Sequence, residues 1–310
     1  MTLPFTLQQL RIIKAIASEK NFTRAAKILF ISQPSLSKQV KLLESHLGIL
    51  LINRENNKIS LTEAGKLFLQ YSERVLALCE ESCRALNDLK NGERGNLTVG
   101  ASQTIGTYLM PRILALFAQN YPQINLKVQV ESTRIIAKNV VNRDIDIAVV
   151  GGEIPEELKK NLQIKNFVED ELILIIPKSH PFATKKTKSI KKNDLYHLNF
   201  ITLNPNSTIR KFIDNILILN NIEPKQFKII MQLNSIEAIK TAVSLGLGAA
   251  FVSSSAIEKE IELKKIEIIK IENIKITRIL SIITNPECYR SKAFEFFYNE
   301  LSILKNKTKH

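Results

Sequence analysis

The chain has 310 residues, of which 45% are hydrophobic, and its 44 basic and 30 acidic residues give a net charge of +14. This length predicts two or three domains, and the apolar fraction excludes a disordered chain. No apolar stretch reaches the roughly 18 residues of a membrane-spanning helix. Because residues 1–10 resemble neither a signal peptide nor a transit peptide, we expect a soluble protein that works where it is made.

The positive charge favours a polyanionic partner through counterion release, but it does not locate the binding site. Residues 1–63 hold nine basic and four acidic residues, residues 64–92 are balanced, and most of the excess lies in the C-terminal two-thirds. Lysine, isoleucine and asparagine are abundant there, and all three have A/T-rich codons. A low-GC genome is therefore our preferred explanation for much of the excess.

Three short helices are predicted at the N-terminus. Residues 6–20 place apolar side chains on one face after Thr6, a residue type that is preferred as a helix N-cap. A second run buries alanines and a leucine, and it ends at a tight break at residues 30–32. The third helix starts at the N-cap Ser32, has Pro34 in its first turn and ends at Gly48. Its apolar positions, at spacings of four, three and four, are Leu36, Val40, Leu43 and Leu47.

Helix, short turn and helix is the layout that places a second helix in the major groove of DNA. The polar face of the third helix carries amides, hydroxyls and lysines that can reach base edges and phosphates. The alternative is a helical hairpin whose polar face meets only solvent. The predicted DNA contacts are Thr23, Gln33, Ser35, Ser37, Lys38, Lys41, Arg54 and Thr62.

A two-stranded wing is predicted next, with residues 49–52 and 58–61 flanking a turn at residues 55–57. Arg54 at the base of this wing is well placed for a phosphate. A surface ion pair is the alternative for Arg54.

A long helix is predicted from residue 62 to 91, because apolar or small residues recur at alternating steps of four and three. These seam positions are Ala64, Phe68, Tyr71, Val75, Leu78, Ser82, Ala85 and Leu89. No other N-terminal element is long enough to pair with this seam, so a second copy of the chain is expected as its partner. A dimer would read two half-sites related by a two-fold axis. The alternative is packing on the chain's own C-terminal part.

Residues 91–95 read as a polar, glycine-bearing hinge, after which strands and helices alternate. This alternation predicts a parallel-rich α/β sheet covered on both faces, in two lobes with a switch near residues 165–170 and a return near 270. The predicted strands are 97–100, 124–131, 145–150, 171–177, 200–203, 227–233, 249–253, 265–271 and 279–284. The predicted helices are 105–119, 133–141, 207–220, 235–245 and 291–305.

A small-molecule site is expected between these lobes, where strands end and helices begin. Backbone amides at the helix starts would favour an anion such as a carboxylate or a phosphate. The alternative for any one residue is a role as an N-cap or turn former. The predicted effector contacts are Ser102, Gln103, Thr104, Ser132, Thr133, Thr202 and Asn204.

The sequence does not indicate an enzyme, because it contains no P-loop, G-x-S-x-G or H-E-x-x-H motif. Gly246 and Gly248 follow a predicted helix rather than a strand and read as a helix stop. The four histidines are scattered. Cys79, Cys83 and Cys288 lack the partners of a zinc site, so they are expected to be reduced thiols, with a thiol sensor as the alternative. No metal and no cofactor is therefore expected.

The chain resembles the LysR-type family of transcription regulators over nearly its whole length. The N-terminal match runs through residues 25–26, 32–37, 43–48, Arg54 and 61–65, and the C-terminal match through residues 97–100, 146–148, 180–183 and 235–248. Departures are Ile52 for the usual Phe, Asn142 where Gly is common, and Ser253 where Pro is frequent.

The resemblance implies a winged helix-turn-helix at 1–63, a linker helix at 64–92 that pairs in a homodimer or tetramer, and a two-lobed effector domain at 93–310 that looks like a periplasmic binding protein. Lobe I is expected at about 96–166 and 270–305, and lobe II at about 167–269. Similarity to plastid-encoded algal members implies the chloroplast stroma and control of carbon-fixation genes. A bacterial cytoplasmic regulator, or a solute-binding protein that does not bind DNA, is the alternative.

Overall fold

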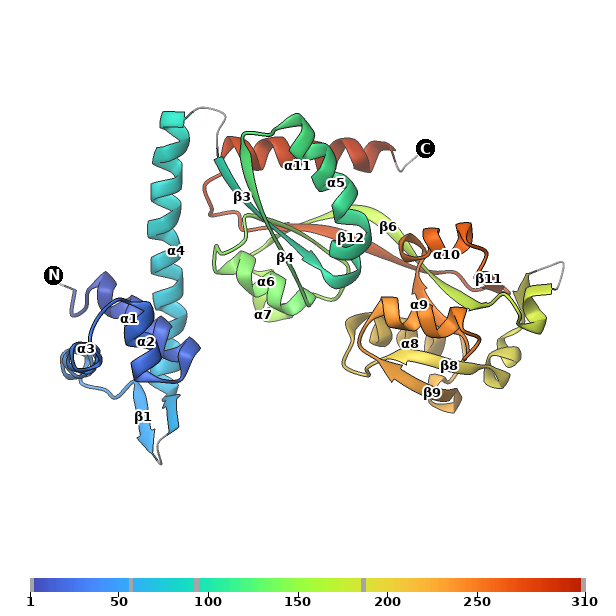
Figure 1. Cartoon of the computed structure of the whole chain (residues 1–310), viewed down its shortest axis with the longest axis horizontal. Coiled ribbons are helices and arrows are strands. Elements are labelled where there is room, and N and C mark those ends of the chain that lie inside the picture. The colour runs from blue at the N-terminus through green and yellow to red at the C-terminus, as the bar shows by residue number, and fades with distance from the viewer. Residues whose placement is uncertain (1–2, 56–57, 92–94, 185–187, 308–310) are drawn as a thin grey trace. The chain divides into compact units, whose positions relative to one another are not determined.

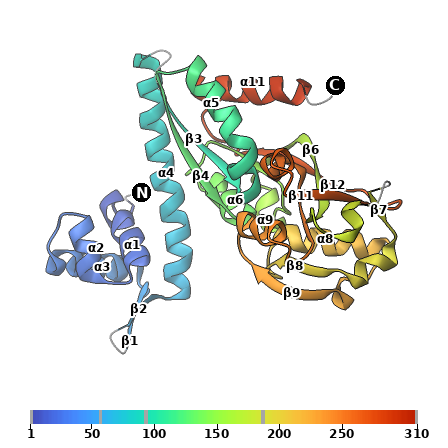
Figure 2. The same cartoon turned by 45° about the vertical axis from the view of Figure 1, so that its right-hand side comes forward.

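The computed structural model describes residues 3–55, 58–91, 95–184 and 188–307, and the chain divides into two compact units. The first unit comprises residues 1–92 with 142–144, and the second comprises residues 93–141 with 145–310. Figures 1 and 2 show helices with a small β-ribbon in the first unit, and mixed strands and helices in the second. This is the winged helix-turn-helix with a linker helix and a two-lobed α/β domain that the sequence predicts.

The three N-terminal helices are α1 (Leu7–Glu19), α2 (Phe22–Ile28) and α3 (Gln33–Leu47). Each begins at a side-chain cap. Thr6 forms a capping box with Gln9, Asn21 accepts from the Arg24 N–H, and Ser32 accepts from the Ser35 N–H. Gly48 ends α3, as predicted, and it adopts the left-handed conformation. The helices bury a common apolar cluster that includes Ile12, Ile13, Ile16, Ala25, Ala26, Leu36, Val40, Leu43 and Leu51.

The wing is an antiparallel pair of β1 (Ile52–Glu55) and β2 (Lys58–Leu61), in which Ile52 faces Leu61. The expected turn residues 56 and 57 lie outside the described residues. The prediction that the first strand starts at residue 49 is wrong. The backbone N–H groups of Leu51 and Ile52 donate to the carboxylate of Glu44, and the N–H of Ile49 donates to the carbonyl of Glu44. The N–H groups of Ile49 and Leu51 are therefore bonded to α3, and the regular pairing with β2 begins at Ile52.

The linker helix α4 (Glu63–Asn91) confirms the predicted long helix, but its seam has two parts. Ala64 and Phe68 pack on the apolar cluster of the three short helices. The Phe68 and Phe5 rings pack edge to face, with their centres 5.5 Å apart. Tyr71, Val75 and Leu78 are exposed instead, with 58%, 39% and 52% of their surface accessible. The first turns of the seam therefore belong to the core of the first unit, and three side chains in the middle of the seam are exposed.

The second unit contains one large sheet and one small sheet among the described residues. Neighbouring strands in the large sheet run β4, β3, β5, β12, β6, β11, β7, with β10 also paired to β6. Strands β8 and β9 form the small parallel sheet. The strands are β3 (Gly95–Ser102), β4 (Ile124–Glu131), β5 (Ile147–Val150), β6 (Gln163–Pro177), β7 (Ser189–Ile190), β8 (Asn199–Leu203), β9 (Lys228–Leu233), β10 (Ala250–Ser253), β11 (Ile266–Ile271) and β12 (Ile276–Thr284).

The helices of the second unit follow these strands. They are η1 (Ile105–Leu109), α5 (Met110–Asn120), α6 (Thr133–Val141), α7 (Glu156–Lys159), η2 (Pro181–Thr184), η3 (Lys192–His197), α8 (Thr208–Leu219), η4 (Pro224–Gln226), α9 (Ile236–Ser244), η5 (Ser254–Ala256), α10 (Glu258–Glu262) and α11 (Lys292–Lys307). The element η1 is a π-helical turn, so the predicted helix from 105 to 119 is in fact two segments.

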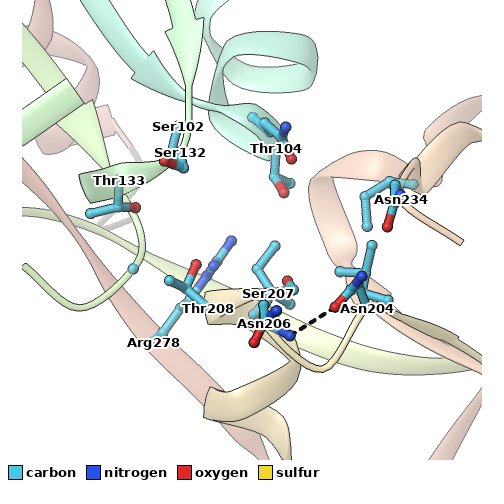
Figure 3. Close-up of a pocket in the computed structure, with 15 residues that line it drawn as sticks. Ser102, Thr104, Ser132, Thr133, Asn204, Asn206, Ser207, Thr208, Asn234 and Arg278 are labelled. Carbon is cyan, nitrogen blue, oxygen red and sulfur yellow. Dashed lines mark hydrogen bonds between the residues drawn. The ribbon is translucent and has the colours of Figure 1, made fainter. Parts of the chain in front are cut away.

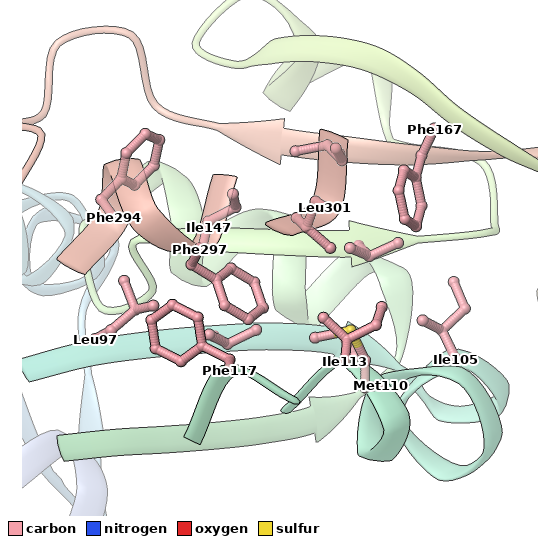
Figure 4. Packing of buried hydrophobic residues seen from close by; sticks show 14 of the residues in the cluster. Leu97, Ile105, Met110, Ile113, Phe117, Ile147, Phe167, Phe294, Phe297 and Leu301 are labelled. Carbon is pink, nitrogen blue, oxygen red and sulfur yellow. The ribbon is translucent and has the colours of Figure 1, made fainter. Parts of the chain in front are cut away.

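Each lobe has its own core. Lobe I is built on β3, β4 and β5, with α5 and α11 on one face and α6 on the other (Figure 1). Figure 4 shows the larger of its two clusters, centred on Phe117 and Phe297. Lobe II is built on β8, β9, β10 and β11, with α8 and α9 packed against them.

Two long antiparallel strands, β6 and β12, join the lobes, and their residues contribute to the cores of both. Ile276 packs in lobe II, whereas Leu280 and Ile282 pack in lobe I. The chain therefore returns to lobe I within β12, later than residue 270. The prediction of a parallel-rich sheet holds for β4, β3 and β5 and for β8 and β9, but β6 and β12 are antiparallel to each other.

Candidate nucleic-acid interface and ligand cavity

The polar face of α3 is accessible. Gln33, Ser35, Lys38 and Lys41 are exposed and Ser37 is half-buried, while Leu36, Val40 and Leu43 on the opposite face are fully buried. Pro34 lies in the first turn, where its missing N–H costs no helical hydrogen bond. The N-terminal half of α3 therefore presents amide, hydroxyl and ammonium groups, which are the groups that read base edges and phosphates in a major groove.

The other predicted DNA contacts lie on different elements of the first unit. Thr23 is exposed in the first turn of α2. Arg54 is on β1, and its side chain lies outside the described residues. The Thr62 hydroxyl donates to the Leu50 carbonyl at 2.8 Å and accepts from the Gly65 N–H at 2.9 Å, so Thr62 caps α4.

Sequence reasoning missed the structural role of Glu44. This residue lies on the buried side of α3 with only 7% of its surface exposed. Its Oε1 accepts the N–H groups of Leu51 at 2.8 Å and Ile52 at 3.1 Å. An acidic residue beside the apolar positions of α3 was the available signal, because a buried carboxylate requires donors nearby. Glu44 thereby fixes the start of the wing relative to α3.

A cavity of about 280 Å³ lies between the two lobes of the second unit. Its walls come from the carboxyl ends of strands and from the starts of helices, as the sequence predicts for this class of sheet. Figure 3 shows hydroxyl and amide side chains of both lobes around this space. The lining residues are Ser102, Gln103, Thr104, Ser132, Thr133, Gly152, Leu203, Asn204, Asn206, Ser207, Thr208, Ile209, Asn234, Ile236 and Arg278.

Six of the seven predicted effector residues line this cavity, and Thr202 does not. Thr202 lies in β8 and borders a separate apolar hollow with Phe200, Phe227 and Phe251. The next two residues, Leu203 and Asn204, reach the cavity at the end of the strand. Thr202 is therefore left out of the site.

Several lining residues were not predicted. Ser207 and Thr208 begin α8 and repeat the pattern of Ser132 and Thr133 at α6, so a strand end followed by a hydroxyl pair was a usable signal. Arg278 lies within β12, and no local pattern marks it.

Two hydroxyls in the cavity wall are buried and make no hydrogen bond within the described part of the chain. They belong to Thr104 and Thr133, which are 4% and 2% exposed. A buried hydroxyl without a partner is unfavourable, and a polar ligand would satisfy it. A carbon atom added at Gly152 would lie 2.7 Å from the Thr133 hydroxyl and 2.8 Å from the Thr208 hydroxyl. Glycine at this position lets hydroxyls from both lobes converge.

A polar cluster, called the clasp below, joins the lobes beside a second hollow that shares Gln103, Thr104, Asn234 and Ile236 with the cavity. The Tyr108 hydroxyl, on the π-helical turn, donates to Glu237 Oε1 on α9 at 2.8 Å. Lys240 lies 2.9 Å from the same oxygen and 4.8 Å from the centre of the Tyr108 ring. Arg112 on α5 also pairs with Glu258 on α10.

The clasp shifts the ionisation of its members. Burial raises the pKa of Tyr108 well above its ordinary value, and Glu237 raises it further, so the phenol stays protonated. Burial alone would raise the pKa of Glu237, but hydrogen bonds from Lys240 and Tyr108 outweigh that effect and lower it. Glu237 is therefore held as a carboxylate that accepts from both neighbours.

Comparison with known families assigns both units. Residues 7–66 match the family described as "Bacterial regulatory helix-turn-helix protein, lysR family", and residues 90–302 match the "LysR substrate binding domain". The chain belongs to the LysR family. It is a DNA-binding transcriptional regulator and not an enzyme. Regulators of this family bind DNA and small-molecule effectors and form oligomers.

Relatives of this LysR regulator match it from end to end. It is 80% identical over 306 residues to the "Probable RuBisCO transcriptional regulator" of Trieres chinensis, covering 99% of each chain. It is 54% identical over 302 residues to the protein of the same name from Cyanophora paradoxa, covering 97% of this chain and 93% of that one.

Solved structures share the fold. A full-length OxyR variant from Pseudomonas aeruginosa has a TM-score of 0.72 at 24% identity, covering 97% of this chain and 96% of that one. Full-length CbnR in complex with its target DNA has a TM-score of 0.69 at 23% identity, covering 96% and 99%. In the described parts of the LysR regulator, no helix combines the length and the apolar character needed to cross a membrane.

Proposed function

We propose that this LysR regulator binds an operator of the Rubisco genes in a plastid, as a dimer or a dimer of dimers, and that a small anionic effector controls it. Support for the target comes from relatives of 54–80% identity that are named as probable Rubisco regulators. The observation that carries the DNA assignment is the exposed polar strip on the N-terminal half of α3, opposite a fully buried apolar face.

Two kinds of contact are expected with the operator. Gln33, Ser35, Ser37 and Lys38 read base edges, because they lie in the first turns of the helix that enters the groove. Contacts with phosphates fix the register of the protein on the duplex. We assign these to Thr23, Lys41 and Arg54, whereas the Thr62 hydroxyl, which already donates its proton to the Leu50 carbonyl, supports the start of α4 beside them.

Pairing of two chains is assigned to the exposed middle of α4. Tyr71, Val75 and Leu78 form an uncovered apolar stripe at the seam spacing, and such a stripe on a long helix is suited to a second helix. The resulting dimer presents two copies of α3 to two half-sites.

The effector is assigned to the cavity between the lobes. Its wall combines the starts of α6 and α8 with the buried, unpartnered hydroxyls of Thr104 and Thr133. Helix starts favour negative charge, so a carboxylate or phosphate ester is the expected class. Occupation of the cavity would change the angle between the lobes, and α4 would transmit this change to the spacing of the half-sites.

The DNA assignment is tested by fluorescence anisotropy with the upstream region of the Rubisco genes. The Gln33→Ala/Lys38→Ala double variant is expected to bind at least about tenfold more weakly and to lose discrimination against a scrambled duplex. Lys14→Ala, which removes one exposed lysine from α1, is the control and should change affinity little. Wild-type affinity and specificity in the double variant would contradict the assignment.

The target is tested separately by immunoprecipitation of the protein from plastids, followed by sequencing of the bound DNA. Enrichment upstream of the Rubisco genes is expected. Enrichment only at other promoters would refute the proposed operon and leave the DNA contacts standing, and absence of the protein from plastids would refute the location.

A further inference from the structure

A single charged side chain, Arg278, is present among the described residues that line the effector cavity. It lies in β12, one of the two strands that join the lobes, and only 5% of its side chain is exposed. Figure 3 shows it close to Thr208, with Thr133 and Ser132 of the other lobe nearby. A guanidinium in this position faces the ligand space from the strand that both lobes share.

Arg278 is held by acceptors from different parts of the domain. Its Nε donates to Asp170 Oδ2 at 2.8 Å, and its Nη1 donates to the carbonyl of Gly151 at 3.2 Å. Its Nη2 lies 2.7 Å from the same carboxylate oxygen, yet it is buried and makes no well-directed hydrogen bond within the described part of the chain. A guanidinium has five N–H donors, so donors remain for a further oxygen atom.

Asp170 is itself fixed. It is the direct cross-strand partner of Arg278 on β6, and its Oδ1 accepts from the Ser253 hydroxyl at 2.5 Å. Ser253 is in β10 of lobe II, whereas Gly151 follows β5 of lobe I. A carbon atom added at Gly151 would lie 3.1 Å from Arg278 Cζ, so glycine permits this close approach. The guanidinium is thus oriented by groups from both lobes.

We propose that Arg278 is the residue that specifies an anion in this cavity, and that Asp170 positions it and offsets its charge. This inference rests on the effector cavity proposed above. The guanidinium binds one oxygen of a carboxylate or phosphate group of the effector, together with the unpartnered Thr133 hydroxyl. Arginine suits this task because its planar fork directs N–H groups at oxyanions.

The neutrality of the pair has a consequence for binding. The negative charge of Asp170 offsets the positive charge of the Arg278 guanidinium. The anion is therefore attracted by the directed N–H donors of Arg278 at short range more than by net charge. Anion affinity is then expected to depend weakly on salt, in contrast to DNA binding, which depends on it strongly.

The test uses the full-length protein and sodium phosphate as the probe, titrated calorimetrically at constant ionic strength and pH, with glycerol as the neutral comparison. Arg278→Gln is expected to weaken phosphate binding at least about tenfold, because one charge-assisted contact is lost. Arg278→Lys should retain part of the affinity. Arg134→Gln is the matched control, because its guanidinium is exposed on α6 and paired with Glu157.

Asp170→Asn tests the compensating role. The amide oxygen of Asn can still accept from Arg278, but the negative charge is gone, so phosphate should bind severalfold more tightly. Unchanged or weaker binding would overturn the role given to Asp170. If substitutions at this buried pair prevent folding, Thr133→Val decides the question, because it leaves the pair intact and should weaken phosphate binding severalfold.

Two outcomes would overturn the inference. One is phosphate binding by Arg278→Gln or Thr133→Val with wild-type affinity, and the other is wild-type protein that binds phosphate no better than glycerol. Operator affinity without phosphate is measured in the same variants and is expected to stay unchanged. If the DNA assignment fails, the wild-type protein will not bind the operator. This result is separate from the phosphate titration, so the two failures can be told apart.

Discussion

At the scale of single residues, two glycines of the first unit are required for different physical reasons. Gly48 ends α3 with φ at +68°, and a carbon atom added there would meet nothing within 4 Å. Gly65 lies in the first turn of α4, and a carbon atom added there would lie 2.0 Å from the Leu51 carbonyl oxygen. The first glycine satisfies a conformational need, and the second permits contact between two backbone segments.

Alanine substitutions separate these two reasons. Gly48→Ala is expected to lower the free energy of unfolding by roughly 1–2 kcal/mol, which is the cost of the left-handed conformation. Gly65→Ala should cost about 3 kcal/mol or more, because backbone atoms must move. Urea denaturation, with hydrogen exchange to locate the effect in α1–α4, measures both. Equal losses would contradict the close contact at Gly65.

The buried carboxylate of Glu44 gives a second prediction at this scale. Glu44→Ala leaves the buried N–H groups of Leu51 and Ile52 without their acceptor, so the first unit should lose about 2–3 kcal/mol of stability. Glu44→Gln keeps one oxygen acceptor and should lose less. Hydrogen exchange at residues 49–52 is the direct measurement, and unaltered protection in Glu44→Ala would disprove the role.

At the scale of elements, caps and periodicity predicted most helices of this chain, since their causes are local. Thr6, Ser32 and Gly48 mark helix ends that the structure confirms. The full length of β6 was not predicted, because its first half contains exposed polar residues and is held by pairing with the distant β12. The π-helical turn at 105–109 likewise depends on tertiary packing, since a carbon atom at Gly106 would lie 2.6 Å from Val130.

The residues of the candidate effector site also fall into those that the sequence predicts and those that depend on tertiary contacts. Hydroxyl pairs at strand ends were predictable, because parallel strands bring their carboxyl ends to one edge. Arg278 was not predictable, because it reaches the cavity only through its pairing with Asp170 across two strands far apart in sequence. Thr202 was expected at the cavity but borders the separate hollow beside Phe200, because packing decides which face of a strand is covered.

The clasp between η1 and α9 predicts a pH dependence of stability. Burial opposes ionisation of Glu237, but Lys240 and Tyr108 lower its pKa below the ordinary value of 4.5. A carboxyl with a lowered folded pKa stabilises the fold above the unfolded pKa, and this contribution disappears as the pH falls through the folded value. Because the Glu237 side chain is 58% exposed, solvent screens the contribution to less than about 1 kcal/mol.

The measurement compares wild type with Glu237→Gln by urea denaturation at several pH values. The variant should be slightly less stable at about pH 7, and the difference should shrink as the pH falls below the ordinary glutamate pKa of 4.5. A difference that stays constant down to about pH 3 would show that the carboxylate charge has no part in the clasp.

At the scale of the whole molecule, the exposed stripe on α4 links the DNA-binding unit to assembly. A regulator that contacts two half-sites gains affinity because binding of the second half-site is intramolecular. Loss of pairing should therefore weaken operator binding without any change in α3. The stripe residues Tyr71, Val75 and Leu78 are the expected contacts between two chains.

Leu78→Glu places a charge in this stripe and should raise the dissociation constant of the dimer at least about tenfold, because a desolvated carboxylate is unfavourable in an apolar contact. Sedimentation velocity measures the dimer, and anisotropy compares a complete operator with a single half-site. Affinity for the complete operator should fall toward that of the half-site, which itself should not change. Cys83→Glu is the control, since Cys83 is exposed on the same helix and lies on a different face from the predicted seam. If the Leu78→Glu protein remains dimeric and binds the operator normally, the two chains do not pair through this stripe.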